Sequence, residues 1–252
     1  MRLIGIESNI IWESPSENRV VFEALIRDAL NSTTGKVDVV VLPENFTSGF
    51  SMNIDSVDSW SNGLTVNWMK NLCRELDIAI CGSVAFKLDD CTARNRSLFV
   101  TPGGEVNIYD KKHLFTLGGE DENYVAGKDR IVVEFKGWKF LLQICYDLRF
   151  PVFSINNPDN VYDAIIYVAN WPKPRIHAWR TLLQARAIEN QCYVIGVNRC
   201  GEDPIGNIYT GESLGVNPWG EIASKGPIVD LNCDKDKLDE FRRIYPFIAD
   251  GG

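Results

Sequence analysis

Three ionisable residues follow apolar, strand-like segments, and their chemistry is complementary. Glu44 ends the segment VDVVVLPE, Lys111 ends NIYDK, and Cys145 ends LLQIC. Polar groups at the ends of buried strands cost free energy unless they are paired, so we expect the three side chains to converge. Each residue alone is more often a cap, a solvated lysine or a packed thiol, but together these explanations require three coincidences.

A carboxylate, an ammonium group and a thiol form a coherent set for acyl transfer. The carboxylate can take the thiol proton, while the lysine favours the thiolate and stabilises a developing oxyanion. The two histidines are less well placed. His113 follows the lysines and His177 follows a double-proline loop, so either would have to be recruited from a loop to pair with the cysteine.

The segment around the cysteine, KFLLQICYDLRFP from Lys139 to Pro151, indicates a buried strand that ends at the thiol and then turns sharply. The amides of such a turn would stand behind the thiol. An α/β enzyme places a nucleophile at this kind of position.

Hydrophobic periodicity predicts alternating strands and helices that position these residues. Apolar strands covered by helices, together with hairpins, indicate mixed sheets in one domain. Strands are expected at 2–12, 37–44, 77–86, 163–169, 192–200 and 227–234, hairpins at 93–115, 131–145 and 209–224, helices at 17–30, 65–76, 176–191 and 238–247, and a loop at 116–127.

Composition excludes several classes of function. A net charge of −8 argues against binding to nucleic acid, and no apolar run approaches the ~20 residues of a transmembrane helix. No signal peptide is visible at the start of the sequence. The seven cysteines are scattered and odd in number, which favours a reducing cytoplasm over a disulfide framework. Without a C-x-x-C pair and with two histidines, a zinc site is not expected.

Three motifs in order carry a family resemblance. LPENFTSGF, YDKKHLF and ICYDLRFP resemble the signature segments of the nitrilase, or carbon–nitrogen hydrolase, superfamily and its Glu–Lys–Cys triad. The later segments ANWPKPR, HAWRTLLQARAIENQCYVIGVNR and GESLGVNPWGE resemble the ω-amidase branch. The resemblance runs nearly end to end.

The resemblance implies a role for each matching residue. Glu44 would be the general base, Cys145 the nucleophile and Lys111 the lysine of the oxyanion hole, which the backbone amide of Tyr146 would complete. Lys112 would be a bystander, because the family places its lysine two residues before the histidine of this segment.

The family also has a second glutamate shortly after the lysine. Glu120 matches best in spacing, and Glu122 is the alternative. Either residue could instead belong to a solvated acidic loop. The doubled glycine at 118–119 has no explanation at this stage.

The implied reaction is hydrolysis of small dicarboxylate monoamides, such as 2-oxoglutaramate and 2-oxosuccinamate, to acid and ammonia through a cysteine thioester. No metal or organic cofactor is required. Another enzyme of the superfamily, namely a nitrilase, a carbamoylase or a different amidase, is the main alternative. A catalytically silent binding protein on the same fold is a further one, although an intact triad argues against it.

A substrate carboxylate needs a cation, and arginine offers bidentate pairing. Arg175, in the proline-rich loop, is the first candidate. Arg149 is expected instead to form a structural ion pair with a nearby acid. Phe46, Tyr146 and Trp171 are candidates for the walls of the substrate pocket, with ordinary core packing as the alternative for each.

The resemblance further implies a four-layer α-β-β-α sandwich with two mixed sheets, formed by residues 1–252 as a single carbon–nitrogen hydrolase domain. It also implies a homodimer or a higher homo-oligomer that associates through helices, including the one at Arg180–Asn190. The expected partner is therefore a small amide and a second copy of the chain, with no nucleic acid and no membrane.

Overall fold

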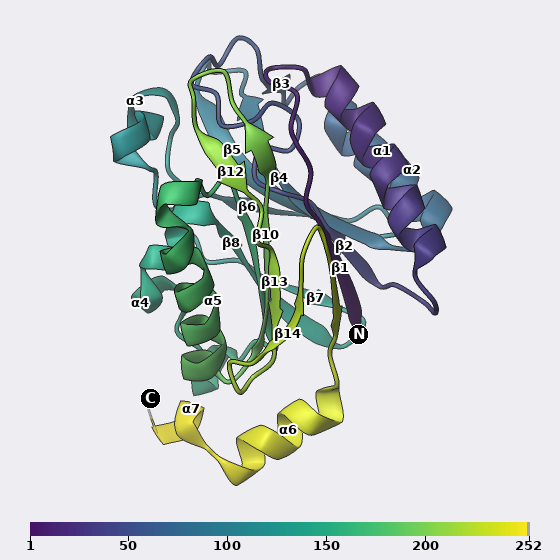
Figure 1. The fold of residues 1–252 in the computed structure, drawn as a ribbon, viewed down its shortest axis with the longest axis vertical. Helices are drawn as coiled ribbons and strands as arrows, with labels where there is room; N and C mark the ends of the chain where they lie inside the picture. Colours follow the sequence, from purple (N-terminus) through teal and green to yellow (C-terminus); the bar gives the residue numbers. More distant parts are fainter. Residues whose placement is uncertain (251–252) are drawn as a thin grey trace.

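Two β-sheets lie face to face in the computed structural model, and helices cover the outer face of each (Figure 1). The structure describes residues 1–250, so the last two residues of the expected 1–252 domain lie outside the described part. The strands are β1 (Arg2–Ile6), β2 (Val39–Val41), β3 (Asp58–Ser59), β4 (Ala79–Lys87), β5 (Ala93–Val100), β6 (Val106–Asp110), β7 (Val132–Phe135), β8 (Trp138–Ile144), β9 (Ala164–Ala169), β10 (Tyr193–Asn198), β11 (Cys200–Glu202), β12 (Ile208–Thr210), β13 (Leu214–Val216), β14 (Ile222–Lys225) and β15 (Ile228–Asn232). The helices are α1 (Pro15–Ser32), α2 (Leu64–Leu76), α3 (Glu120–Asn123), α4 (Pro151–Ser154), α5 (Ile176–Asn190), α6 (Lys235–Ile244) and α7 (Phe247–Asp250), with short 3₁₀ helices η1 (Thr116–Gly118), η2 (Cys145–Arg149), η3 (Pro158–Asn160) and η4 (Lys173–Arg175).

Both sheets are mixed, as predicted. The first has the order β15-β1-β2-β4-β5-β6, in which β1, β2 and β4 are parallel and the remaining neighbours on this path are antiparallel. The second has the order β14-β13-β10-β9-β8-β7, with a parallel centre formed by β8, β9 and β10. Parallel strands of this kind are buried on both faces, which explains why β2 and β9 consist entirely of apolar residues.

The core has three layers of apolar side chains, which confirms the expected α-β-β-α sandwich. Between the sheets, residues such as Phe99 and Phe140 stack at 5.7 Å between ring centroids. Outside the first sheet, Phe22 of α1 packs in the layer that α1 and α2 cover. Outside the second sheet, Trp179 and Leu183 of α5 pack on the strands. The observed helix α1 is longer at both ends than the helix predicted at 17–30, and Pro15 lies in its first turn.

Several predicted elements differ from the structure. The hairpin predicted at 209–224 is divided, because β12 pairs with β11 and only β13 and β14 form a hairpin. The first strand ends at Ile6 rather than continuing to residue 12, because the chain leaves the sheet and its backbone at Ile11 pairs with the side-chain amide of Asn18. The predicted loop at 116–127 contains η1 and α3, joined by Gly119 at a φ of 70°. This left-handed conformation explains the second glycine of the doublet.

The carboxyl ends of four strands bring the candidate residues to one end of the sandwich. β2 and β6 run in the same direction within the first sheet, and β8 and β9 are parallel within the second. Glu44, Lys111, Cys145 and Asn170 follow these four strands closely. Within residues 1–250, no helix combines the length and apolar character needed to cross a membrane.

Candidate active site

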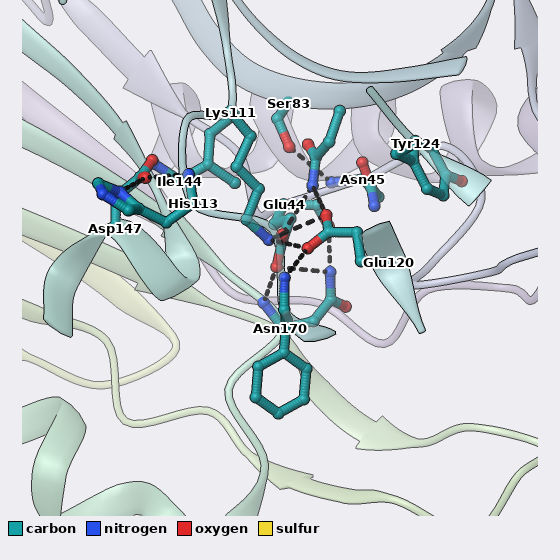
Figure 2. Close-up of polar contacts among 12 residues, drawn as sticks. Glu44, Asn45, Ser83, Lys111, His113, Glu120, Tyr124, Ile144, Asp147 and Asn170 are labelled. Atoms are coloured by element: carbon teal, nitrogen blue, oxygen red, sulfur yellow. Dashed lines mark hydrogen bonds and ion pairs between the residues drawn. The ribbon is translucent and has the colours of Figure 1, made fainter. Parts of the chain in front are cut away.

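A buried ion-pair cluster stands at the centre of the candidate site (Figure 2). The Lys111 Nζ lies 2.8 Å from Glu44 Oε1, and 3.0 and 2.9 Å from the two carboxylate oxygens of Glu120. All three side chains are at most 1% exposed. Charges this deeply buried persist only when they are paired, so the lysine and the two carboxylates depend on one another.

The two carboxylates determine the charge state of Lys111. Burial by itself lowers the pKa of the ammonium group, but the negative charges of Glu120 and Glu44 outweigh it and raise the pKa above its ordinary value. Burial, followed by the charge of Glu44, raises the pKa of Glu120, although Lys111 opposes both effects. The lysine is therefore cationic, and the cluster carries more negative than positive charge when both glutamates are ionised.

Two asparagines fix the position of Glu44. The Asn95 side-chain amide, from β5, donates to Glu44 Oε1 at 2.8 Å and also reaches Glu120 Oε1 at 3.1 Å. The backbone N–H of Asn170 donates to Glu44 Oε2 at 2.7 Å, and its side-chain amide donates to the Glu44 carbonyl oxygen. Neither asparagine was predicted. Asn170 follows a buried apolar strand, which is the same signal that identified the three ionisable residues, whereas Asn95 lies within a strand and has no such signal.

The structure separates the two candidates for the second glutamate. Glu120 is fully buried against Lys111, and its Oε2 also accepts the backbone N–H of Phe115. Glu122 is exposed. At Gly118, a Cβ atom would lie 2.8 Å from the Phe115 ring, so the first glycine of the doublet allows close packing beside the site.

Cys145 is the first residue of η2 and adopts a φ of 45°. A positive φ is unusual for a residue with a side chain and costs conformational energy that the surrounding contacts must offset. Its partly exposed side chain opens onto the same pocket as Lys111. Burial, and then the charge of the Glu44 carboxylate, raises the pKa of the thiol well above its ordinary value, against the opposite effect of Lys111. The free thiol is therefore protonated near neutral pH and needs a base to react.

Asp147 connects the turn that begins at Cys145 (η2, here called the cysteine turn) to residues 109–113 around Lys111. Its fully buried carboxylate accepts the backbone N–H of Ile144 at 2.9 Å and the hydroxyl of Tyr109 at 2.7 Å. It also accepts the backbone N–H of His113 at 3.0 Å and lies 2.8 Å from the Nδ1 of that ring. The position of His113 is thus structural, beside the turn (Figure 2).

A cavity of about 400 Å³ leads to the thiol. Its walls are mainly apolar and aromatic, and no aspartate or glutamate of residues 1–250 is among the residues that line it. Trp171 and Tyr146, two of the predicted wall residues, do line the cavity. The lining residues are Trp12, Phe50, Met52, Lys111, Phe115, Leu117, Gly118, Cys145, Tyr146, Arg149, Asn170, Trp171, Pro172, Arg175, Ile205, Asn207 and Tyr209.

Phe46 does not line the cavity, contrary to the prediction. It is fully buried and packs in the layer beneath α1 and α2, with its ring centroid 5.3 Å from that of Phe22 and 5.9 Å from that of Trp68. The preceding residue, Asn45, has a φ of 46°. The chain therefore reverses at Asn45, and the Phe46 ring enters the core. Phe50, four residues later, lines the cavity instead.

Both candidate arginines reach the cavity. Arg175 lies with its guanidinium 5.0 Å from the centre of the Phe115 ring, and Arg149 lies 4.9 Å from the centre of the Trp171 ring. The ion pair expected for Arg149 is absent, because no carboxylate of residues 1–250 lies within 4.0 Å of its guanidinium.

Comparison with known proteins agrees with this arrangement. The family model described as carbon-nitrogen hydrolase matches residues 2–228. The chain is 42% identical to omega-amidase YafV of Escherichia coli K12 over 98% of this chain and 94% of that protein. It is 32% identical to 2-oxoglutaramate amidase of Bacillus subtilis over 97% and 95%.

Among solved structures, XC1258 from Xanthomonas campestris, described as a CN-hydrolase superfamily protein with an arsenic adduct in its active site, is 39% identical. It superposes with a TM-score of 0.94 over 100% of this chain and 97% of that one. The motifs, the sandwich and these matches lead to one assignment: the chain belongs to the carbon–nitrogen hydrolase family.

Proposed function

We propose that the protein is an ω-amidase-like enzyme, which hydrolyses small dicarboxylate monoamides of the 2-oxoglutaramate or 2-oxosuccinamate type to the acid and ammonia. The observation that carries the proposal is the opening of Cys145 and Lys111 onto one cavity, with Glu44 bound to the lysine behind them. The names of the E. coli and B. subtilis relatives support the substrate class.

The first half-reaction forms a thioester. Cys145 Sγ attacks the amide carbonyl carbon while Glu44 takes the thiol proton, which the raised thiol pKa makes necessary. The Lys111 ammonium group and the backbone N–H of Tyr146 donate to the oxyanion. The C–N bond then breaks, and ammonia leaves with the proton that Glu44 returns.

The second half-reaction releases the acid. Water attacks the thioester carbonyl and gives its proton to Glu44, and the carbon–sulfur bond breaks as the thiol is protonated again. Glu120 stays bound to Lys111 throughout and keeps the ammonium group in place. Every proton is returned, so the cycle needs no further reactant besides water.

Two further features of the proposal concern the state of the enzyme. All seven cysteines are free thiols, which supports a reducing compartment such as the cytoplasm. Exposed apolar residues on and beside α4 and α5, namely Val152 at 82%, Ile155 at 47% and Ile188 at 55% exposure, support association with a second copy through these helices.

The proposed function is tested by ammonia release from 2-oxoglutaramate. The wild type should release ammonia, and Cys145→Ala should not. Cys91→Ala is the matched control, because Cys91 is an exposed cysteine that does not line the cavity and its loss should leave the rate unchanged. If wild-type protein turns over nitriles or carbamoyl compounds but not this amide, the substrate class is wrong. If it turns over none of them, a binding function is favoured.

A further inference from the structure

Arg199 is a buried arginine beside the cavity wall that has no carboxylate partner. It directly follows β10, is fully buried and does not itself line the cavity. No carboxylate of residues 1–250 lies within 4.0 Å of its guanidinium. An arginine side chain remains charged in a protein, and a buried charge without an opposite charge costs free energy. The contacts that offset this cost therefore indicate the role of Arg199.

The charge of Arg199 lies against the ring of Tyr209. The guanidinium is 4.6 Å from the centre of this ring, and a cation over an aromatic face is attracted most strongly when both groups are desolvated. Nη2 donates to Asn9 Oδ1 at 2.9 Å and to the Ile10 carbonyl oxygen at 3.3 Å. Nε donates to the Cys200 carbonyl oxygen at 3.3 Å, and Nη1 is buried without a hydrogen-bond partner in residues 1–250. The ring face thus offsets part of a cost that these hydrogen bonds leave.

Tyr209 links this buried charge to the cavity. It belongs to β12 and lines the cavity, and its hydroxyl donates to Asp203 Oδ2 at 2.8 Å. The same buried carboxylate accepts the backbone and side-chain N–H groups of Asn207, which also lines the cavity, at 2.8 and 2.9 Å. A cation therefore holds the ring face of Tyr209 while a carboxylate holds its hydroxyl, so both the position and the orientation of the ring are fixed.

The hairpin that carries Tyr209 depends on such side-chain contacts. β11 and β12 pair with each other and belong to neither main sheet. A two-stranded hairpin is marginally stable by itself in water. Ile205, Asn207 and Tyr209 of this hairpin all line the cavity. Arg199 joins the hairpin to the loop after β1 through its contacts with the Tyr209 ring and with Asn9, so it helps to fix one wall of the cavity.

We propose that Arg199 is a positioning residue that acts through the Tyr209 ring and sets the length of amide that the cavity accepts. With its ring held at two points, Tyr209 cannot move aside for a longer substrate without leaving a buried charge exposed to the cavity. A fixed apolar wall discriminates between substrates that differ by one methylene by about 10- to 200-fold. The inference rests on the proposed function for the identity of the substrate, but the fixed wall itself does not depend on it.

The kinetic test compares 2-oxoglutaramate with 2-oxoadipamate, which is one methylene longer. The wild type should prefer the shorter amide by about 10- to 200-fold in kcat/KM. Arg199→Met removes the charge but keeps a long side chain, and it should reduce this preference at least about fivefold, mainly through KM, because the ring is released. Arg199→Lys keeps a cation for the ring face and should retain most of the preference. An unchanged preference in folded Arg199→Met protein would overturn the proposal.

Arg242→Met is the control for loss of a structural arginine. Arg242 pairs with Asp163 and donates to the Tyr162 carbonyl oxygen, and none of these residues lines the cavity. This variant should lose stability but keep the wild-type preference. Tyr209→Leu should relax the preference as Arg199→Met does, and the two together should add little, because the arginine acts through the ring. If Arg199→Met protein does not fold, Tyr209→Leu decides alone, and an unchanged preference in that variant overturns the proposal.

Alkylation of Cys145 tests the wall without an amide substrate. The cavity leads to this thiol, so a bulky reagent has to fit within the same wall. The ratio of the alkylation rates by N-phenyliodoacetamide and by iodoacetamide, followed on the Cys145 peptide by mass spectrometry, should rise at least about fivefold in Arg199→Met but not in Arg242→Met. If this ratio rises while no amide is hydrolysed, the fixed wall stands and the proposed function fails. If 2-oxoglutaramate is hydrolysed but neither the ratio nor the length preference changes in Arg199→Met, the proposed function stands and the inference is wrong.

Discussion

The ammonium group of Lys111 contacts both carboxylate oxygens of Glu120, at 3.0 and 2.9 Å. Because the same group also contacts Glu44 at 2.8 Å, the lysine is shared between a proposed base and a second carboxylate that is fully buried. Glu120 thus holds Lys111 independently of Glu44, the carboxylate that is proposed to exchange protons. In the proposed mechanism, this second contact keeps the ammonium group in place while Glu44 is transiently neutral.

Loss of Lys111 should destabilise the fold in a pH-dependent way. Lys111→Met leaves two buried carboxylates without a cation, which costs about 3–5 kcal/mol of unfolding free energy at neutral pH. Burial already raises the pKa of Glu120, and removal of the lysine raises it further. An acid whose folded-state pKa is raised destabilises the fold above that pKa and ceases to do so once it is protonated below its unfolded value. The deficit should therefore shrink as the pH falls from 8 to 5.

Urea unfolding of Lys111→Met and wild type across this pH range measures the effect. Lys112→Met is the matched control, because Lys112 is partly exposed, makes no ion pair within residues 1–250, and should show little change. A deficit that stays constant with pH would show that the cost comes from packing rather than from unpaired charge.

Glu44→Gln should make the Cys145 thiol easier to alkylate but should slow the hydrolysis of the amide. After burial, the charge of Glu44 is the largest cause that raises the pKa of Cys145, so its removal should lower that pKa. Alkylation of the thiol by iodoacetamide should then begin at a lower pH than in the wild type. Ammonia release should nevertheless fall by about 10²–10⁴-fold, because the proposed general base is gone. Parallel loss of alkylation and hydrolysis would mean that Glu44 only maintains the structure.

Most of what the sequence predicts about the site comes from the residues at the ends of apolar strands. Glu44, Lys111 and Cys145 each follow an apolar run, and a residue type that is costly to bury signals its position there. The alternation of such runs with amphipathic segments also indicated helices that cover mixed sheets. The four layers themselves followed from the family resemblance, since periodicity does not determine which sheet faces which.

Contacts that depend on backbone direction could not be predicted. Phe46 and Phe50 have the same residue type and the same local composition, yet the left-handed turn at Asn45 sends the first into the core. Asn95 contacts both glutamates from within β5, where alternation alone shows only that its side chain is directed to one face. The prediction of a structural ion pair for Arg149 was wrong, because the sequence does not show that its guanidinium lies over the Trp171 ring.

Asp147→Asn should disturb the cysteine turn more than the binding of substrate. The carboxylate accepts hydrogen bonds from Ile144, Tyr109 and His113, whereas an asparagine offers one acceptor oxygen and turns its NH₂ group toward remaining donors. We expect kcat to fall at least about tenfold with a smaller change in KM, and unfolding free energy to fall by about 1.5–3 kcal/mol.

Tyr109→Phe, which removes a single donor to Asp147, is the graded control and should have a smaller effect on both quantities. The pH profile of Cys145 alkylation distinguishes positioning from general loss of stability, because only a displaced turn changes how the thiol meets Glu44. An Asp147→Asn protein that is less stable but has a wild-type kcat and alkylation profile would contradict the positioning role.

Substitutions of Phe46 and Phe50 should separate effects on stability from effects on substrate binding. Phe46 is fully buried among the side chains beneath α1 and α2, so Phe46→Ala should cost about 3–5 kcal/mol of unfolding free energy through lost burial and a cavity. Phe50 lines the cavity, and its ring lies 5.4 Å from the Lys111 ammonium group. Phe50→Ala should therefore raise KM and lower kcat while it reduces stability less, because its ring is already partly exposed. Chemical unfolding and steady-state ammonia release, measured below the unfolding transition of Phe46→Ala, give both quantities for each variant. If Phe46→Ala alters KM as strongly as Phe50→Ala does, the turn at Asn45 does not isolate the core from the cavity.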